Sequence, residues 1–473
     1  MNFFSSAALI GMGKSNTALA RFLSEQGVKL SLRDKSTNAP IPADLLDNPL
    51  ISVNLGSAYL SGLYEDVIFR SPSVRPDLPE ISEAVSRGAT LSSETEYFFS
   101  LCPSPIIAIT GSDGKTTTAT LCREILSKKY GDGAYLLGNV GTPAVSTLAS
   151  IRHTDICITE LSSFQLMDFC PVCNAALITN ITENHLNWHT DINEYIHAKS
   201  NIYKNASLCV INADDPICSE IHIAGSIYYS ISQNREKLAH KYGRARFVFI
   251  DNDDVFITEH GTGKRKYLFS LSDIRIPGRH NAANAVAAAA LCADYVSADD
   301  IKSAISAFEG VDHRCSFIGE YGGIRYIESS IDSTPSRTAA TVKAVGKVKG
   351  LTVICGGANK NLSYTPLCDV LSEYAETVIF TGACGMDMMN SIISYPTYNP
   401  LKTNISYVQS FDEAVKTAIN KTVKGGCVLL SPAATSFDCF SNYVERAERF
   451  RNIIFSLSDN NAHNEGSAND NSV

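Results

Sequence analysis

Residues 106–118 read IIAITGSDGKTTT and carry the strongest chemical signal in the chain. An apolar run that ends in two glycines, a lysine and threonines predicts a strand leading through a phosphate-binding loop into a helix. In such a loop Lys115 would reach the terminal phosphates, and the hydroxyl of Thr116 would ligate Mg²⁺. The glycines are closer together than in the common G-x-x-x-x-G-K-[ST] pattern. A plain strand-to-helix turn is the weaker alternative, because Gly-Lys-Thr-Thr follows a strong strand.

Polar side chains that could serve a metal follow two further expected strands. Glu160 ends the apolar run DICITE, and His185 and His189 lie in NITENHLNWH, directly after another run. In a doubly wound sheet the carboxyl ends of strands gather where the phosphate loop lies, which predicts that these groups face the phosphates. A lone histidine is more often structural, so each imidazole alone is a weak signal. Composition alone favours a surface position for Lys199, within a helical stretch.

The glycines at the N-terminus predict a second nucleotide-type site. Gly11 and Gly13 follow an apolar run, and Asp34 ends the next one, where a ribose-binding acid would lie. The third glycine of the dinucleotide fingerprint is absent, because Asn16 stands there. The motif therefore fits either a nucleotide site or a tight turn. A second site of this type suggests a substrate that itself carries a nucleotide, in addition to ATP.

Strand and helix patterns alternate along most of the chain and divide it into three α/β stretches. This alternation is typical of parallel sheets with right-handed crossovers. The alanine-rich segment GRHNAANAVAAAALCADYV predicts a helix that is packed on every face. The expected domains are residues 1–102, 103–311 and 312–458, and the composition of a tail at 459–473 predicts disorder.

Composition limits the kind of partner that this chain can have. At 473 residues two or three domains are expected, and a net charge of -9 without a basic cluster argues against a nucleic-acid partner. No apolar run reaches the length of a membrane span. The 14 scattered cysteines favour a reduced, cytoplasmic setting. Cys170 and Cys173 have metal-ligand spacing, but no second pair is evident, so a metal or redox role is the weaker interpretation.

A series of short motifs then identifies a family. In chain order they are TGSDGKTT, LGNVGTP, ELSSFQL, ITENHLNWH, YIHAKSNIYKNA, NADD, GRHNAANAVAA, DHR, GGANKN and SPAATSFDCF. In these motifs and their order, over nearly its whole length, the chain resembles the Mur ligases, the ATP-dependent amide ligases of peptidoglycan precursor synthesis. The last two motifs and ELSSFQL resemble most the members that add D-glutamate to UDP-N-acetylmuramoyl-L-alanine.

The resemblance implies a fold and a reaction. The family has a Rossmann-like N-terminal domain for the UDP group, a central P-loop ATPase-like doubly wound sheet and a mobile, Rossmann-like C-terminal domain. The substrate carboxylate would attack the γ-phosphate of ATP, and the amine of D-glutamate would then attack the acyl phosphate, giving ADP and phosphate. Two Mg²⁺ ions, small-molecule substrates, a monomer and a cytoplasmic role in cell-wall synthesis and cell division are implied as well. The nucleotide-sugar substrate would account for the incomplete glycine fingerprint.

The resemblance also assigns residues to roles. The UDP-substrate would lie near Ser15, Asn16, Thr17, Asp34, Ser71, Pro72, Asn139 and Ser162. ATP would contact Gly111, Ser112, Asp113, Gly114, Lys115, Thr116 and Thr117, with Asn281 and Asn284 near adenine and Arg314 near the phosphates. One metal would take Thr116 and Glu160, and the other His185 and a carbamylated Lys199. D-glutamate would contact Lys360, Ser436, Phe437 and Tyr443. The catalytic set would be Lys115, Glu160, His185, Lys199 and Arg314.

Several positions depart from the family pattern. Ser329 replaces the aspartate that contacts the ribose, and Glu328 or Asp332 could take over that contact. Asparagines stand at 184 and 187 in the histidine motif, and an alanine follows Arg446 where the family has glycine. Two alternatives therefore stay open: a Mur-type ligase for another amino acid, and a nucleotide-binding member that no longer catalyses. Hydride transfer is disfavoured because the third glycine is missing.

Overall fold

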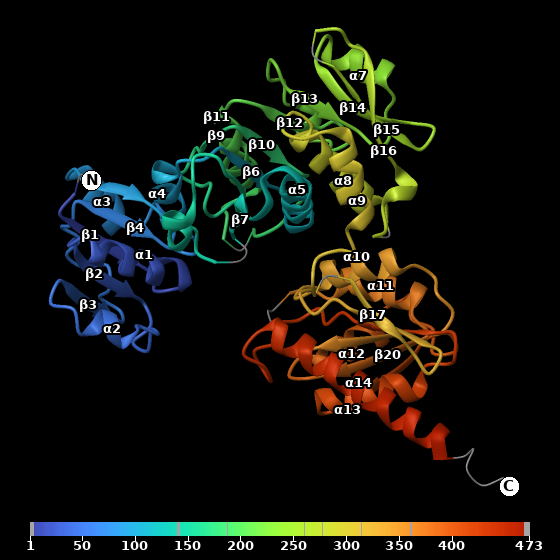
Figure 1. The fold of residues 1–473 in the computed structure, drawn as a ribbon. Helices are drawn as coiled ribbons and strands as arrows, with labels where there is room; N and C mark the ends of the chain where they lie inside the picture. The colour runs from blue at the N-terminus through green and yellow to red at the C-terminus, as the bar shows by residue number, and fades with distance from the viewer. Residues whose placement is uncertain are drawn as a thin grey trace. The chain divides into compact units, whose positions relative to one another are not determined.

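The computed structural model describes residues 4–139, 142–186, 188–259, 261–276, 278–313, 315–359 and 362–467, with side chains as far as residue 456. The described chain forms two compact units: residues up to 275 together with 279–308, and residues 276–278 together with those from 309 onward. The first unit holds two large sheets and the second holds one. Figure 1 colours these parts from blue through green to red along the chain.

The first stretch folds around a parallel five-stranded sheet of order β3-β2-β1-β4-β5. Its strands are β1 (Ser6–Ile10), β2 (Lys29–Asp34), β3 (Ile51–Leu55), β4 (Val67–Arg70) and β5 (Thr90–Ser92). Its helices are α1 (Lys14–Glu25), α2 (Ala43–Leu46), α3 (Pro79–Ser86) and α4 (Glu94–Leu101). The strand order reverses between β1 and β4, so the crevice beyond their carboxyl ends is where such folds bind ligands.

The central stretch folds around a nine-stranded sheet of order β16-β15-β14-β13-β12-β10-β6-β8-β7. Its strands are β6 (Ile106–Thr110), β7 (Ala134–Gly138), β8 (Ile156–Glu160), β10 (Ala175–Ile178), β12 (Cys209–Asn212), β13 (Ile227–Tyr229), β14 (Arg246–Asp251), β15 (Asp254–Thr258) and β16 (Arg265–Ser270). A short pair, β9 (Val172–Cys173) and β11 (Asn205–Ala206), lies outside it. Strands β6, β8 and β10 are wholly buried, as apolar runs in a parallel sheet should be.

The helices of the central stretch are α5 (Lys115–Tyr130), α6 (Ile192–Ser200), α7 (Arg235–Tyr242), α8 (Arg279–Cys292) and α9 (Ala298–Ala307). Short 3₁₀ turns are η1 (Gly131–Gly133), η2 (Ala144–Ser150), η3 (Asn201–Tyr203), η4 (Cys218–Glu220) and η5 (Leu271–Asp273). Every residue of α8 from Asn284 onward is buried, which confirms the prediction of a helix packed all round.

The second unit folds around a six-stranded sheet of order β17-β18-β22-β19-β20-β21. Its strands are β17 (Ser316–Tyr321), β18 (Ile324–Glu328), β19 (Leu351–Gly356), β20 (Thr377–Thr381), β21 (Asn404–Tyr407) and β22 (Cys427–Leu430). Its helices are α10 (Pro335–Val345), α11 (Thr365–Tyr374), α12 (Gly385–Ile393), α13 (Phe411–Lys421) and α14 (Tyr443–Ser467). β19 and β22 are wholly buried, and β19 has parallel partners on both sides.

The α/β class with parallel sheets is confirmed, but three hairpins in the described chain add antiparallel pairs that the sequence patterns did not predict. β15 pairs antiparallel with β14, β16 pairs antiparallel with β15, and β17 pairs antiparallel with β18. The β14–β15 hairpin turns at Asn252 and Asp253, both with positive φ, and the β17–β18 hairpin turns at Gly322 and Gly323, also both positive. Positive φ at both central positions is the signature of the tight turn that joins two-residue hairpins, and Asn, Asp and Gly adopt it readily.

The C-terminal helix also differs from expectation. The backbone continues α14 to Ser467, so residues 459–467 of the segment expected to be disordered are helical in this structure. Extending a helix costs little once its start is fixed, and Phe450, Ile453 and Ile454 anchor α14 by their burial. Within the described ranges no helix is long and apolar enough to cross a membrane.

Candidate active site

The glycines of the phosphate loop are required by the backbone that the loop adopts. Gly111 has φ +149°, and a Cβ there would lie 1.8 Å from Thr179 Oγ1. Gly114 has φ +79°, and a Cβ there would lie 2.3 Å from Asn284 Oδ1. The loop therefore closes tightly on the residue after β10 and on α8. Because Gly114 is the N-cap of α5, the positive end of a 16-residue helix lies at this loop, as an anion site needs.

The segment after β10 and helix α6 hold the other residues of the loop, and α8 contacts the first turn of α5. Ser112 Oγ donates to the carbonyl of Thr182 at 3.0 Å and lies 2.7 Å from the hydroxyl of Tyr195. The N–H of Asp113 donates to Asn180 Oδ1 at 2.9 Å. On α8, Asn284 Nδ2 lies 3.4 Å from Asn281 Oδ1, and Thr118 Oγ1 on α5 donates to Asn284. The asparagines predicted to lie near adenine are thus placed beside the loop itself.

Two lysines converge on one carbonyl of the loop. Lys115 Nζ lies 2.8 Å from the carbonyl oxygen of Gly111, and Lys199 Nζ lies 2.7 Å from the same atom. Lys199 is 2 % exposed and stands over the ring of Tyr195. Burial, followed by the positive charge of Lys115, lowers the pKa of Lys199 well below its ordinary value. The surface position that composition favours for Lys199 is therefore wrong.

Glu160 connects the loop to the neighbouring strand. It ends β8 and is 1 % exposed. Its Oε2 accepts a hydrogen bond from Thr116 Oγ1 at 2.8 Å, and its Oε1 accepts one from Asn139 Nδ2 at 3.0 Å. A threonine hydroxyl beside a buried carboxylate at the mouth of a phosphate loop is a fitting donor pair for a hard cation such as Mg²⁺.

His185 has an unusual backbone. It has φ +58°, is exposed, and its ring centroid lies 4.9 Å from that of Phe164. Its N–H donates to Asn184 Oδ1. Among the described residues, no three side chains of His, Cys, Asp or Glu gather as a metal site would require. A Mg²⁺ ion held by Thr116 and Glu160 would therefore complete its coordination with oxygens of phosphate or water, which suits its preference for few protein ligands.

Substituting Gly114 tests the fit of the loop against α8. Gly114→Ala is expected to lower the melting temperature by several degrees and to weaken ATP binding, because its Cβ would meet Asn284. Gly27 is the matched control: its φ of +77° is nearly the same, and nothing lies within 4 Å of its Cβ position. Thermal melts and nucleotide titrations of the two alanine variants would separate the clash from the backbone strain. Equal effects of the two substitutions would contradict the close fit.

The crevice of the first sheet carries the residues predicted for the UDP group. Asp34 Oδ2 accepts from the N–H of Met12 at 2.7 Å, so this carboxylate supports the glycine turn. Asn16 is 2 % exposed, and its amide donates to the carbonyls of Ile10 and Gly11. Ser15 and Thr17 are half-buried in the first turn of α1, and Ser71 and Pro72 are half-buried after β4.

Asn16 thus builds the turn with its amide nitrogen. A Cβ at Gly11, which has φ +85°, would lie 2.7 Å from the Cβ of Ser71, so the two turns of the crevice touch. Ser162 lies outside this crevice, in the ELSSFQL loop, where its Oγ donates to Gln165 Oε1.

An ion pair between a buried arginine and an exposed aspartate, which the sequence patterns did not predict, links the first two sheets. Arg70, at the end of β4, is 1 % exposed and pairs with Asp168 through two of its nitrogens. It also donates to the carbonyl of Phe164 at 2.8 Å. The partners are 98 positions apart, so no local pattern could reveal them. The pair fixes the ELSSFQL loop against the crevice.

In the second unit, two loops lie side by side at the carboxyl ends of β19 and β22. Ala358 pairs with Thr435, and a Cβ at Gly357 would lie 2.1 Å from the Thr435 carbonyl oxygen. Ser436 is 3 % exposed in the second loop. Of the other residues predicted for D-glutamate, Phe437 and Tyr443 are exposed. Lys360, like Arg314 and Asn187, lies outside the described residues.

Arg446 lies buried beneath these loops. Its Nε donates to Ser330 Oγ at 2.9 Å, and its Nη2 donates to the carbonyl of Ala434 at 3.1 Å. Nη1 makes no hydrogen bond to any part of the chain that the structure describes. Burial lowers the pKa of Arg446 to about 10, so the guanidinium stays charged at neutral pH. The sequence around Arg446 gives no signal of this burial, because an arginine is typical of a surface.

The residues near β18 where the chain departs from the family pattern are all buried. Ser329 is 0 % exposed and accepts from the N–H of Cys315 at 3.0 Å. Glu328 is equally buried and accepts from the N–H of Ser330, beside the ring of His313. Asp332 accepts the hydroxyls of Thr341 and Ser431. Both carboxylates therefore already have internal partners in this structure, which speaks against either one taking over a ribose contact.

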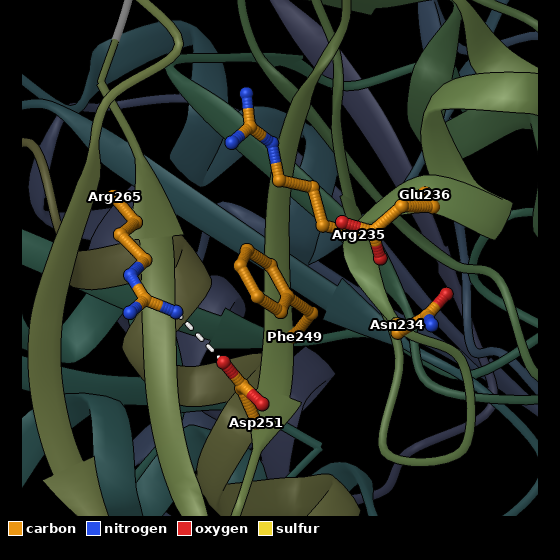
Figure 2. Close-up of a pocket in the computed structure, with 6 residues that line it drawn as sticks. All are labelled: Asn234, Arg235, Glu236, Phe249, Asp251 and Arg265. Carbon is orange, nitrogen blue, oxygen red and sulfur yellow. Dashed lines mark hydrogen bonds and ion pairs between the residues drawn. The ribbon is translucent and has the colours of Figure 1, made fainter.

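Two other features lie apart from these groups. Figure 2 shows a cavity of about 270 Å³ beside β14, lined by Asn234, Arg235, Glu236, Phe249, Asp251 and Arg265. Its arginines and acids balance in charge, and none of the predicted site residues lines it. All 14 cysteines are free, and burial raises the pKa of the Cys173 thiol to about 12.

Comparison with known proteins identifies the family. Residues 5–93 match the model of the Mur ligase MurD-like N-terminal domain, and residues 109–292 match that of the Mur ligase middle domain. The chain is 37 % identical over 462 residues to a UDP-N-acetylmuramoylalanine–D-glutamate ligase from Ruminiclostridium cellulolyticum, covering 95 % of this chain and 96 % of the relative. The chain belongs to the Mur ligase family. A ligase of the same name from Clostridium botulinum is 36 % identical, with 96 % and 97 % covered.

Solved Mur ligases share the fold. The UDP-N-acetylmuramate–alanine ligase MurC from Thermotoga maritima aligns with a TM-score of 0.58 at 18 % identity, covering 96 % of this chain and 99 % of that chain. A pseudomurein peptide ligase type C from Methanothermus fervidus aligns with a TM-score of 0.55 at 19 % identity, covering 96 % and 100 %. The three-sheet organisation of this Mur ligase is therefore that of its structural relatives.

Proposed function

We propose that this Mur ligase adds D-glutamate to UDP-N-acetylmuramoyl-L-alanine, with cleavage of ATP to ADP and phosphate, in peptidoglycan precursor synthesis. The observation that carries the proposal is its 36–37 % identity, over nearly the full length, to ligases named for that reaction. The loop with Lys115, Thr116, Glu160 and Lys199 supports it, because these side chains lie together at a glycine loop that leads into a helix N-terminus, as a phosphate site requires.

The residues of the first unit would activate the substrate. Its terminal carboxylate attacks the γ-phosphorus and the bond to the ADP oxygen breaks, while Lys115 and the N-terminus of α5 stabilise the charge that develops. Thr116 and Glu160 would hold one Mg²⁺, and His185 and a carbamylated Lys199 a second, and these ions would neutralise phosphate charge. In the predicted cradle of the second unit, Ser436 would orient D-glutamate, whose amine attacks the acyl carbon and displaces phosphate.

Further parts of the proposal rest on the resemblance. We propose two Mg²⁺ ions, a monomer and a cytoplasmic location, and the 14 cysteines scattered through the sequence favour such a reduced compartment. Arg314 near the ATP phosphates and Lys360 on the α-carboxylate of D-glutamate belong to the same proposal.

The test is release of ADP and phosphate by the purified chain with Mg²⁺, ATP and UDP-N-acetylmuramoyl-L-alanine. D-glutamate is compared with L-glutamate, L-alanine and L-lysine. We expect release that depends on D-glutamate. Release with another amino acid would keep the ligase chemistry and change the substrate. Binding of ATP without release in any mixture would favour a member that has lost catalysis.

A further inference from the structure

The loop that follows β4 is tied to the loop that carries His185. Trp188, the single tryptophan of the chain, donates through its indole Nε1 to the carbonyl of Ser73 at 3.1 Å. The guanidinium of Arg75 lies 5.1 Å from the centroid of the Trp188 ring, and its Nη1 donates to the Trp188 carbonyl at 2.8 Å. Ser73 and Arg75 are therefore joined through backbone and side chain to Trp188, more than 100 positions along the chain.

Arg75 also reaches α6, the helix that carries Lys199. Its Nη2 donates to Glu194 Oε1 at 2.8 Å, and Nη1 lies 3.2 Å from Glu194 Oε2. The two side chains are 22 % and 17 % exposed, so water screens this bidentate pair only in part. Asp77 binds the other side of Arg75 at 2.7 Å, which keeps the guanidinium in a fixed orientation.

Glu194 extends the contact to the histidine loop. Its Oε2 accepts from the N–H of Thr190 at 2.9 Å and lies 3.2 Å from Nδ1 of His189. Nε2 of His189 lies 2.9 Å from Ser163 Oγ in the ELSSFQL loop. One connected set of hydrogen bonds therefore runs from Arg75 through Glu194 to the loop that precedes α6, and through His189 to the ELSSFQL loop.

These contacts end on the turn that His185 begins. The N–H groups of Trp188 and His189 both donate to the carbonyl of His185, at 2.9 and 3.0 Å. His185 itself has φ +58°, a conformation that a non-glycine residue keeps only when its surroundings hold it. Trp188 and His189, which hold it, are themselves bound to Ser73, Arg75, Glu194 and Ser163.

We propose that Arg75 is a positioning residue that couples the sugar-nucleotide loop, residues 71–77, to the conformation of His185. The inference rests on the proposed function, in which Ser71 and Pro72 lie near the uridine diphosphate and His185 serves the second metal. A substrate that orders residues 71–77 thereby orders the turn at His185 and prepares the metal site. The coupling operates within the first unit, because all of these residues belong to it.

The test uses the single tryptophan as its reporter. In the wild-type chain we expect UDP-N-acetylmuramoyl-L-alanine, added without ATP, to change the fluorescence of Trp188, while calorimetry records binding independently. In Arg75→Met the fluorescence change is lost, turnover falls about tenfold, and the Mg²⁺ concentration for half-maximal rate rises severalfold. Arg75→Lys should restore the fluorescence change, the turnover and the Mg²⁺ requirement only in part, because lysine lacks the bidentate fork of arginine. Arg21→Met is the control, since Arg21 forms an exposed pair with Asp44 in the same sheet domain.

Glu194→Gln weakens the same contact between Arg75 and α6 from the other partner. If Arg75→Met does not fold, the same measurements on Glu194→Gln test the coupling. Binding by the wild-type chain without a fluorescence change would overturn the coupling and leave the proposed function intact. The same holds if the Mg²⁺ requirement stays within twofold of wild type in Arg75→Met or Glu194→Gln. Absence of any sugar-nucleotide binding by the wild-type chain would instead overturn the proposed function, and the inference with it.

Discussion

Replacing Lys199 by methionine is expected to lower D-glutamate-dependent phosphate release by about 10²- to 10³-fold. Lys199 is 2 % exposed, and its pKa is held well below the ordinary value by burial and by Lys115. A neutral amine can react with CO₂ to give a carbamate, whose oxygens are suitable ligands for Mg²⁺. Methionine keeps the length and packing of the stem but removes the amine, so the loss would report chemistry and leave the fold in place.

Two measurements distinguish a carbamylated Lys199 that binds Mg²⁺ from a purely structural role for Lys199. With ¹³C-labelled bicarbonate, the wild-type chain should show a carbamate carbon signal by NMR that Lys199→Met lacks. Lys204→Met, at an exposed lysine five positions along the chain, should keep both the signal and the activity. Wild-type-like turnover of Lys199→Met, or a carbamate signal that survives the substitution, would rule out carbamylated Lys199 as a metal ligand.

Local sequence patterns were sufficient for the phosphate loop and its strands. Apolar runs such as 106–110 can only be buried, and a strand must end where glycines with positive φ begin, as at Gly111. The position of Glu160 follows from the same logic, because the ends of neighbouring parallel strands meet at one edge of a sheet. The direct hydrogen bond from Thr116 to Glu160 agrees with the expected position of Glu160 beside the phosphate loop.

Contacts between distant segments were beyond such patterns. Lys199 has the composition of a surface residue, and only the fold shows that α6 turns it toward the carbonyl of Gly111. The pairs of Arg70 with Asp168 and of Arg75 with Glu194 join positions 98 and 119 apart. A single sequence carries no periodic signal for such pairs, since each charge taken alone is typical of a surface.

The antiparallel hairpins were not predicted for a different reason. The signal for the β17–β18 hairpin was local and readable, because two glycines stand between two short segments rich in aromatic and β-branched residues at 316–328. The alternation of strands and helices elsewhere favoured parallel sheets throughout, and this broader pattern outweighed the turn. A two-residue Gly-Gly or Asn-Asp connection is too short for a crossover, so it required an antiparallel neighbour.

Substituting alanine for Lys115 is expected to reduce turnover by roughly 10²-fold or more, the scale of losing one electrostatic stabiliser. In this structure Nζ of Lys115 lies on the carbonyls of Gly111 and Ser112, at 2.8 and 2.9 Å, so the ammonium is already at the loop that would hold the phosphates. Since the charge on the transferred phosphoryl group develops in the transition state, the loss should fall mainly on kcat and less on the KM for ATP.

Lys128 provides the matched control for that substitution. It lies in the last turn of the same helix α5 and is exposed, so Lys128→Ala removes an equal charge from the far end of the helix. Steady-state rates and melting curves of the two variants would separate charge at the phosphates from general effects on α5. Lys115→Ala with near-normal kcat would contradict the assignment of residues 111–117 to ATP. A similar fall in both variants would trace the loss to the helix, because Lys128 lies too far along α5 to reach a phosphate held at its N-terminus.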